Sequence, residues 1–91
     1  MSIANEYKSV YFENKAFAKH PEWPRIDKAT GSDLTMGTAL TKDGLTYTVV
    51  DGFANEIGYI DAVTGKATYT DHPGELEETF IQYAKEALGL K

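Results

Sequence analysis

Histidine and carboxylate pairs are the first residues in this chain that could do chemistry. Glu22 follows His20 by two positions, and Glu75 follows His72 by three. A protein zinc site needs three or four ligands drawn from Cys, His, Asp and Glu, and this chain has 2 His and no Cys. The sequence therefore predicts no metal site and no cofactor, and we interpret both histidines as surface or capping residues.

Nucleophilic and phosphate-binding chemistry lack their usual motifs. Ser2, Ser9 and Ser32 lie in no Gly-x-Ser-x-Gly turn of the kind that exposes a catalytic serine. Gly65-Lys66 is similar to the end of a phosphate-binding loop, but Ile60 stands where that loop needs a glycine. The sequence therefore predicts that the protein is not an enzyme and has no catalytic residues.

Aromatic side chains are the remaining distinctive group. Tyr47, Tyr59 and Tyr69 fall on successive predicted strands and could form one cross-strand cluster. Trp23 and Arg25 lie in a loop that contains two prolines, and Tyr, Trp and Arg dominate the energetics of protein interfaces. We therefore expect these five residues to bind a partner. The alternatives are that the tyrosines only pack the sheet and that Trp23 folds back over one end of the core.

Charge is spread unevenly along the chain. The 9 Lys and Arg against 14 Asp and Glu give a net charge of −5, and the excess of acids falls in residues 31–91. An acidic surface repels nucleic acid and anionic lipid and attracts basic proteins. The predicted sheet holds only Lys42 and Lys66 as cations, too few for a groove that binds single-stranded nucleic acid. We therefore expect a protein partner, for which a basic surface is one option, and no nucleic acid.

The spacing of apolar residues changes to a period of two from residue 34 onward, and this marks the elements that must position these residues. Alternating apolar and polar residues predict strands, and Asp43-Gly44 predicts a two-residue hairpin turn with positive φ angles. Asp51-Gly52 marks a second turn. The predicted strands are residues 34–41, 45–50, 56–62 and 66–70. Together they predict a four-stranded antiparallel meander over about residues 34–70.

A helix is predicted on each side of this meander. Residues 3–18 carry apolar residues at helical spacing, although Val10-Tyr11-Phe12 within them is also typical of a strand. Residues 74–88 carry a clearer apolar stripe, with acidic residues in the first turn and Gly89 after the last. We expect Asp71 or His72 as the cap and Pro73 at the first helical position. The sequence therefore predicts an N-terminal helix over 3–18, a C-terminal helix over about 74–88 and an ordered loop over 20–33.

These elements predict a single small α+β domain over residues 1–91, with both helices packed on one face of the sheet. No apolar run is long enough to span a bilayer, and the first residues lack the pattern of a signal peptide. We therefore expect a cytoplasmic protein that makes no membrane contact.

The prediction for function is a non-enzymatic protein-binding module, a small regulator or inhibitor that acts through a sheet face and the 20–33 loop. Two alternatives stay open. The compact, acidic and motif-poor chain resembles small accessory proteins of phages and mobile elements, which favours a homo-oligomeric structural protein. A homodimer would pair exposed edge strands at residues 34–41 or 66–70. The other alternative is a small-ligand-binding domain with a pocket between the sheet and the helices.

Overall fold

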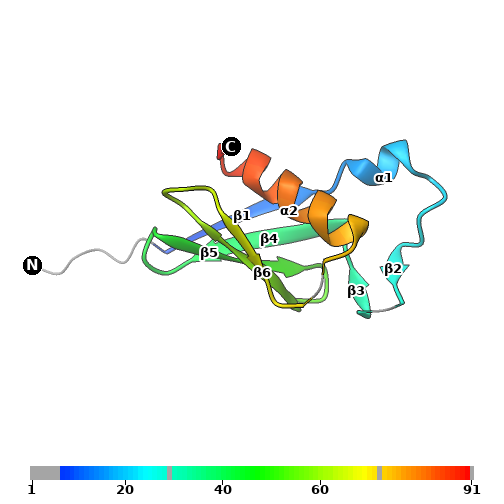
Figure 1. The fold of residues 1–91 in the computed structure, drawn as a ribbon, viewed down its shortest axis with the longest axis horizontal. Coiled ribbons are helices and arrows are strands. Elements are labelled where there is room, and N and C mark those ends of the chain that lie inside the picture. Colours follow the sequence, from blue (N-terminus) through cyan, green and yellow to red (C-terminus); the bar gives the residue numbers. More distant parts are fainter. Residues whose placement is uncertain (1–6, 29, 72, 91) are drawn as a thin grey trace, which may run out of the picture.

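The computed structural model describes residues 7–28, 30–71 and 73–90, and it shows an α+β fold in which the longer helix lies on one face of a five-stranded sheet (Figure 1). The elements in chain order are β1 (Lys8–Glu13), α1 (Ala16–Lys19), β2 (Ile26–Asp27), β3 (Ser32–Asp33), β4 (Met36–Thr41), β5 (Thr46–Asp51), β6 (Glu56–Asp61), β7 (Ala67–Tyr69) and α2 (Glu75–Ala87).

The predicted meander is confirmed. Strands β4, β5, β6 and β7 lie side by side in chain order, and each pairs antiparallel with the next. Strand β1 adds a fifth strand beside β4, in an unbroken register from Lys8 opposite Thr41 to Glu13 opposite Met36. The segment 34–41, predicted as an edge that could pair two copies, is therefore interior, and the edges of this sheet are β1 and β7.

The predicted N-terminal helix over residues 3–18 is wrong for the residues that the structure describes. Residues 8–13 form strand β1, and only the short helix α1 follows; residues 3–6 lie outside the described part of the chain. Phe12, Asn14 and Ala16 are buried while Tyr11, Glu13 and Lys15 are exposed, which is a period of two. The Val-Tyr-Phe triplet suits a strand, and the open side of β4 supplies backbone partners that an isolated helix would lack.

The turn at Asp43-Gly44 forms where predicted but is wider than the predicted two-residue turn. Of these two residues only Gly44 has a positive φ, of 77°, and β4 and β5 are separated by residues 42–45. The Asp43 carboxylate accepts hydrogen bonds from the backbone N–H of Leu45 (2.8 Å) and of Thr46 (3.2 Å), and the Thr41 hydroxyl oxygen accepts one from Gly44 N–H. Side chains thus close this loop in place of the strand ladder.

Helix α2 confirms the predicted C-terminal helix and carries the core. Phe80, Ile81 and Ala84 are buried from it, and the rings of Phe12 and Phe80 lie 4.9 Å apart between their centroids. At Gly37 on β4 a side chain would overlap the Phe80 ring and the Val50 carbonyl oxygen. The helix can therefore approach the sheet closely only because that position is glycine.

The start of α2 differs from the simplest reading of its sequence. Its N-cap is Gly74, so Pro73 precedes the cap and does not take the first helical position. The Glu77 carboxylate turns back to accept a hydrogen bond from Gly74 N–H at 2.8 Å. At the other end Gly89 has a φ of 74° and closes the helix as predicted.

The chain between β1 and β4 leaves the main sheet and returns to it. It contains α1 and the short β2–β3 pair, in which Ile26 lies opposite Asp33. Asn14 anchors the point of departure, because its buried amide donates to the Leu34 carbonyl oxygen (3.1 Å) and the Thr79 hydroxyl oxygen (3.2 Å). This side chain therefore joins the end of β1, the start of β4 and helix α2.

Candidate binding surface

One face of the main sheet has no described element packed on it. Helix α2 covers the opposite face (Figure 1). Side chains of adjacent residues in a strand point to opposite faces, and residues directly opposite each other share a face. Val49 and Ala39 are buried under α2, so their neighbours Thr48, Val50 and Leu40 lie on the uncovered face. We call this uncovered side the open face.

The open face is hollowed near its centre. The hollow has a volume of about 500 Å³ and is lined by Tyr7, Leu40, Lys42, Asp43, Thr46, Thr48, Val50, Ala54, Glu56 and Tyr59. Tyrosine, leucine and valine supply its apolar surface, and charged groups lie among them. Tyr11, with 59% of its surface exposed, and Met36 extend this apolar surface along β1 and β4, where the Tyr11 hydroxyl lies 3.5 Å from the Met36 sulfur.

Tyr59 is held in position at one side of the hollow. Its hydroxyl donates a hydrogen bond of 2.7 Å to the Glu56 carboxylate three residues earlier on the same strand. This hydrogen bond, followed by the charge of Glu56 and by partial burial, raises the pKa of the Tyr59 phenol above its ordinary value. The phenol therefore stays protonated at neutral pH, and its ring stands as a fixed apolar surface beside the hollow.

Asp51 fixes the turn that forms the adjoining rim. One oxygen of this buried carboxylate accepts hydrogen bonds from Phe53 N–H (2.9 Å) and Asn55 N–H (2.7 Å). The other oxygen accepts from Asp33 N–H (3.1 Å) and from the Asn55 side-chain amide (3.1 Å). The turn also holds Ala54 at a φ of 64°, a left-handed conformation that non-glycine residues seldom adopt. Asp51 therefore ties the rim of the open face to the strand pair β2–β3.

The three predicted tyrosines do not form one cluster. Tyr59 lies opposite Thr48 and Thr68, whereas Tyr47 lies opposite Ile60, so Tyr47 and Tyr59 are on different faces. Tyr47 and Tyr69 are half-buried and pack against the core beneath α2. Burial, followed by the charges of Glu78 and Glu77, raises the pKa of Tyr69. Of the three, only Tyr59 is available on the open face.

Trp23 and Arg25 also serve the local structure. The Trp23 ring stacks on His20 at 4.1 Å between centroids and meets Phe17 edge-on at 5.4 Å. The Arg25 guanidinium lies 3.6 Å from the carboxylate of Asp33, which is 9% exposed in its side chain, while Arg25 itself is 68% exposed. Trp23 therefore packs on α1 and on its C-cap residue His20, and Arg25 remains accessible.

A second hollow connects Arg25 with the open face. It has a volume of about 440 Å³, and its lining includes Arg25 and Lys15 together with Tyr11 and Met36. Arg25 thus lies near Tyr11, at the β1 side of the open face, whereas Tyr59 lies on β6 toward the opposite side. The sequence reasoning missed Tyr7, Tyr11 and Leu40 as surface residues, although strand parity in β1 and β4 would have placed them there.

A buried carboxyl group, that of Glu77, lies beside the partly exposed Asp27, away from the open face. Glu77 is 7% exposed; its Oε1 accepts from Gly74 N–H, while its Oε2 finds no donor among the described residues. Burial, followed by the hydrogen bond to Asp27, raises the pKa of Glu77. The folded chain therefore keeps this proton at pH values where the unfolded chain has lost it, so Glu77 destabilises the fold increasingly as pH rises from its ordinary pKa to its raised one.

No site for metal chemistry is apparent in the described residues. His20 Nδ1 lies 3.2 Å from Glu22 Oε2, and no three His, Cys, Asp or Glu side chains within 7–28, 30–71 and 73–90 gather closely enough to hold an ion. His72 lies outside the described part of the chain. In that part, neither helix has the length and apolar character needed to cross a membrane. Comparison of the sequence and fold with protein-family models, curated proteins and solved structures finds no match.

Proposed function

We propose that this chain is a non-enzymatic protein-binding module that binds its partner through the open face of the sheet. The observation that carries the proposal is the composition of that face. An antiparallel sheet with one solvated face usually presents polar residues on it. Here Tyr7, Tyr11, Leu40, Val50 and Tyr59 lie uncovered around and beside a hollow.

The charges around the hollow favour a partner with basic groups at its rim. Asp43 and Glu56 line the hollow against the single cation Lys42, and Asp61 follows Tyr59 by two residues on β6. Complementary charge at the rim would speed association and align the partner, while the central aromatic residues would supply most of the affinity. Arg25 is placed in this proposal at the far end of the face.

The proposed role of the 20–33 loop is reduced to Arg25. Trp23 is stacked on His20 and Phe17, so its truncation would disturb α1 as well as any contact with a partner. We leave Tyr47 and Tyr69 out of the proposed surface because both are half-buried and pack against the core beneath α2. The surface to be tested is therefore centred on Leu40 and Tyr59.

The experiment compares affinity capture by the unaltered chain with capture by Tyr59→Ala and Leu40→Ala. Val63→Ala is the matched control, since Val63 is 80% exposed but lies in the β6–β7 turn, outside the hollow. The proposal expects a protein that is retained by the unaltered chain and by Val63→Ala. Its purified form should bind Tyr59→Ala about tenfold or more weakly, because central interface tyrosines often contribute that much.

Two outcomes would contradict the proposal. One is a partner that binds both open-face variants as tightly as the unaltered chain, because the contact would then lie elsewhere. The other is stabilisation by a small metabolite, abolished in Leu40→Ala, with no protein retained; that result would favour the small-ligand alternative. Circular dichroism of each variant confirms that a loss of binding does not arise from unfolding.

A further inference from the structure

The outer edge of β1 has no strand beside it among the described residues. This strand has 6 residues and pairs with β4 without a bulge, whereas β7 at the other edge has 3. Edge strands that stay single usually carry a proline, a bulge or a charge that points into the core side. Strand β1 carries no proline and no bulge, and on the face beneath α2, where Val10 and Phe12 lie, its one charge is Lys8 at its first residue.

The free backbone groups of this edge can be assigned. Asn14 N–H donates to the Thr35 carbonyl oxygen at 2.9 Å, so the backbone N–H of Asn14 points toward the β4 side. In an antiparallel ladder alternate residues share this direction. The backbone N–H and C=O groups of Phe12 and Val10 therefore also point toward β4. Those of Ser9, Tyr11 and Glu13 point outward, away from the sheet. The edge thus presents three donors and three acceptors.

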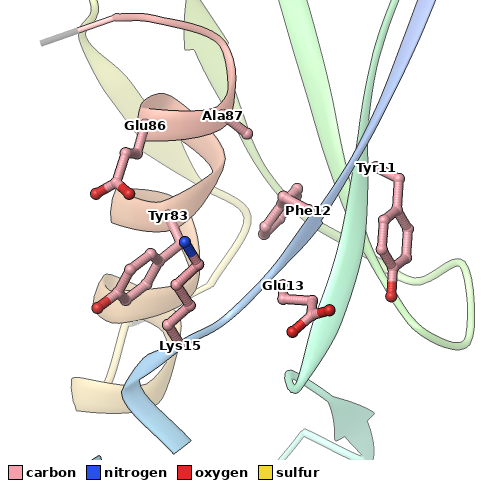
Figure 2. Close-up of a pocket in the computed structure, with 7 residues that line it drawn as sticks. All are labelled: Tyr11, Phe12, Glu13, Lys15, Tyr83, Glu86 and Ala87. Atoms are coloured by element: carbon pink, nitrogen blue, oxygen red, sulfur yellow. The ribbon is translucent and has the colours of Figure 1, made fainter. Parts of the chain in front are cut away.

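A groove beside the edge leaves room for another chain. It has a volume of about 350 Å³ and lies between β1 and the last turns of α2, with Tyr83, Glu86 and Ala87 on the helix side (Figure 2). Figure 2 shows Lys15 beside Tyr83, and Tyr11 on the other side of the strand. Helix α2 therefore does not close the edge.

We propose that a second copy of this chain occupies the edge, with the two β1 strands antiparallel about a two-fold axis that passes beside Tyr11. A two-fold axis perpendicular to the sheet keeps each face on its own side, so opposed residues must come from the same face. Centring on Tyr11 places Tyr11 opposite Tyr11 of the second copy and Val10 opposite its Phe12. Ser9 then lies opposite Glu13 of the second copy.

This register is favoured by the side chains that it brings together. The two tyrosines meet on the open face, Val10 and Phe12 meet beneath the helices, and no like charges lie directly opposite each other. Centring on Val10 instead would put the charged Lys8 opposite the apolar Phe12. The two α2 helices would lie on the same face, where Tyr83 and Ala87 of each copy line the shared groove. The inference does not rest on the proposed function, because the dimer uses the backbone edge of β1 and the proposed contact is centred on Leu40 and Tyr59; the two surfaces meet at Tyr11.

The first test is the mass of the chain in solution. Sedimentation equilibrium should give a species of twice the 10.1 kDa chain mass that dissociates on dilution. Ser9→Pro removes an outward N–H and should raise the dimer dissociation constant at least tenfold, while the β1–β4 ladder stays intact because proline is tolerated where the N–H faces away from its strand partner. Ser9→Ala keeps the N–H and is the matched control. A monomer for the unaltered chain up to about 0.5 mM would overturn the proposal.

A second test addresses the register and does not depend on affinity alone. The chain has no cysteine, so a single introduced thiol can form only an intermolecular disulfide. Tyr11→Cys should cross-link under mild oxidation, because residues opposite each other in a hydrogen-bonded pair have Cα atoms about 5.5 Å apart. Ser9→Cys should not, because residue 9 of the second copy lies four residues along the strand, about 13 Å away. Equal cross-linking of both variants would refute the register.

Discussion

Replacing Asp51 by asparagine should destabilise the fold strongly, although the two side chains have nearly the same shape. Both carboxylate oxygens of Asp51 are used, and each accepts two hydrogen bonds. Asparagine keeps one oxygen and replaces the other by an NH₂ group, which is a donor. If the NH₂ group takes the place of Oδ1, the N–H groups of Phe53 and Asn55 lose their acceptor. If it takes the place of Oδ2, the N–H of Asp33 loses its acceptor and the Asn55 side-chain amide must turn to offer its oxygen.

The expected loss follows from the number and kind of these bonds. A hydrogen bond to a charged acceptor contributes about 1.5–3 kcal/mol, and a buried donor left without an acceptor adds its desolvation cost. At a residue that is 3% exposed, at least one backbone N–H then faces a donor and the remaining bonds go to a neutral oxygen, so the loss is about 2–4 kcal/mol. The total stability of a chain of this length is about 5–14 kcal/mol, so Asp51→Asn should remove a large part of it.

The matched control is Asp61→Asn. Asp61 also ends a strand and also caps the following turn, but it does so with one oxygen, which accepts from Val63 N–H (2.8 Å) and Thr64 N–H (3.0 Å). The asparagine carbonyl oxygen can replace that oxygen, so only a small fraction of the Asp51→Asn effect is expected. Urea denaturation followed by circular dichroism measures both variants. If the two substitutions shift the unfolding midpoint equally, the two-oxygen argument is refuted.

Three further substitutions test other contacts by chemical denaturation. Glu77→Gln should stabilise the chain at pH 7 by about 1–3 kcal/mol, because it removes a buried carboxyl group of raised pKa. It should also flatten the fall of stability with rising pH. Glu78→Gln, on the exposed side of the same turn, is the control and should keep the pH profile of the unaltered chain. Unchanged pH dependence in Glu77→Gln would count against the raised pKa. Gly37→Ala should cost about 3 kcal/mol, because its methyl group would displace the Phe80 ring. Asn14→Ala should cost about 2–4 kcal/mol through the loss of three hydrogen bonds, and a loss below that of a typical surface substitution would show that this link does not stabilise the fold.

Local sequence signals were sufficient for the meander and for α2. The alternation from residue 34 onward and the turn residues Asp43-Gly44 and Asp51-Gly52 act over a few positions, so each strand could be assigned without its partners. Residues 8–13 could not be assigned in that way. Their apolar residues fit both periods, and the decision came from the open side of β4, a partner about 30 residues away in the chain.

For the candidate surface, too, local patterns predicted the strands but not the faces on which their side chains lie. Tyr47, Tyr59 and Tyr69 were correctly expected on successive strands, yet their faces depend on the register between strands. A bulge between β5 and β6 shifts that register beside Val49 and Val50. Tyr7 and Tyr11 were not expected on the surface because they fell within a predicted helix. Asp51 was recognised only as a turn residue, because its contact with Asp33 joins segments that no local pattern connects.

The sequence by itself determined the α+β class, the four strands over residues 34–70 and the C-terminal helix, and it contains no cysteine and 2 histidines. Each of these depends on residue type and on spacing within a few positions. Only the tertiary structure decided that residues 8–13 are an edge strand, that Tyr59 and not Tyr47 or Tyr69 faces outward, and that Glu77 is buried. Those outcomes depend on which distant segments meet, because burial and strand register are properties of pairs of segments and not of one segment alone.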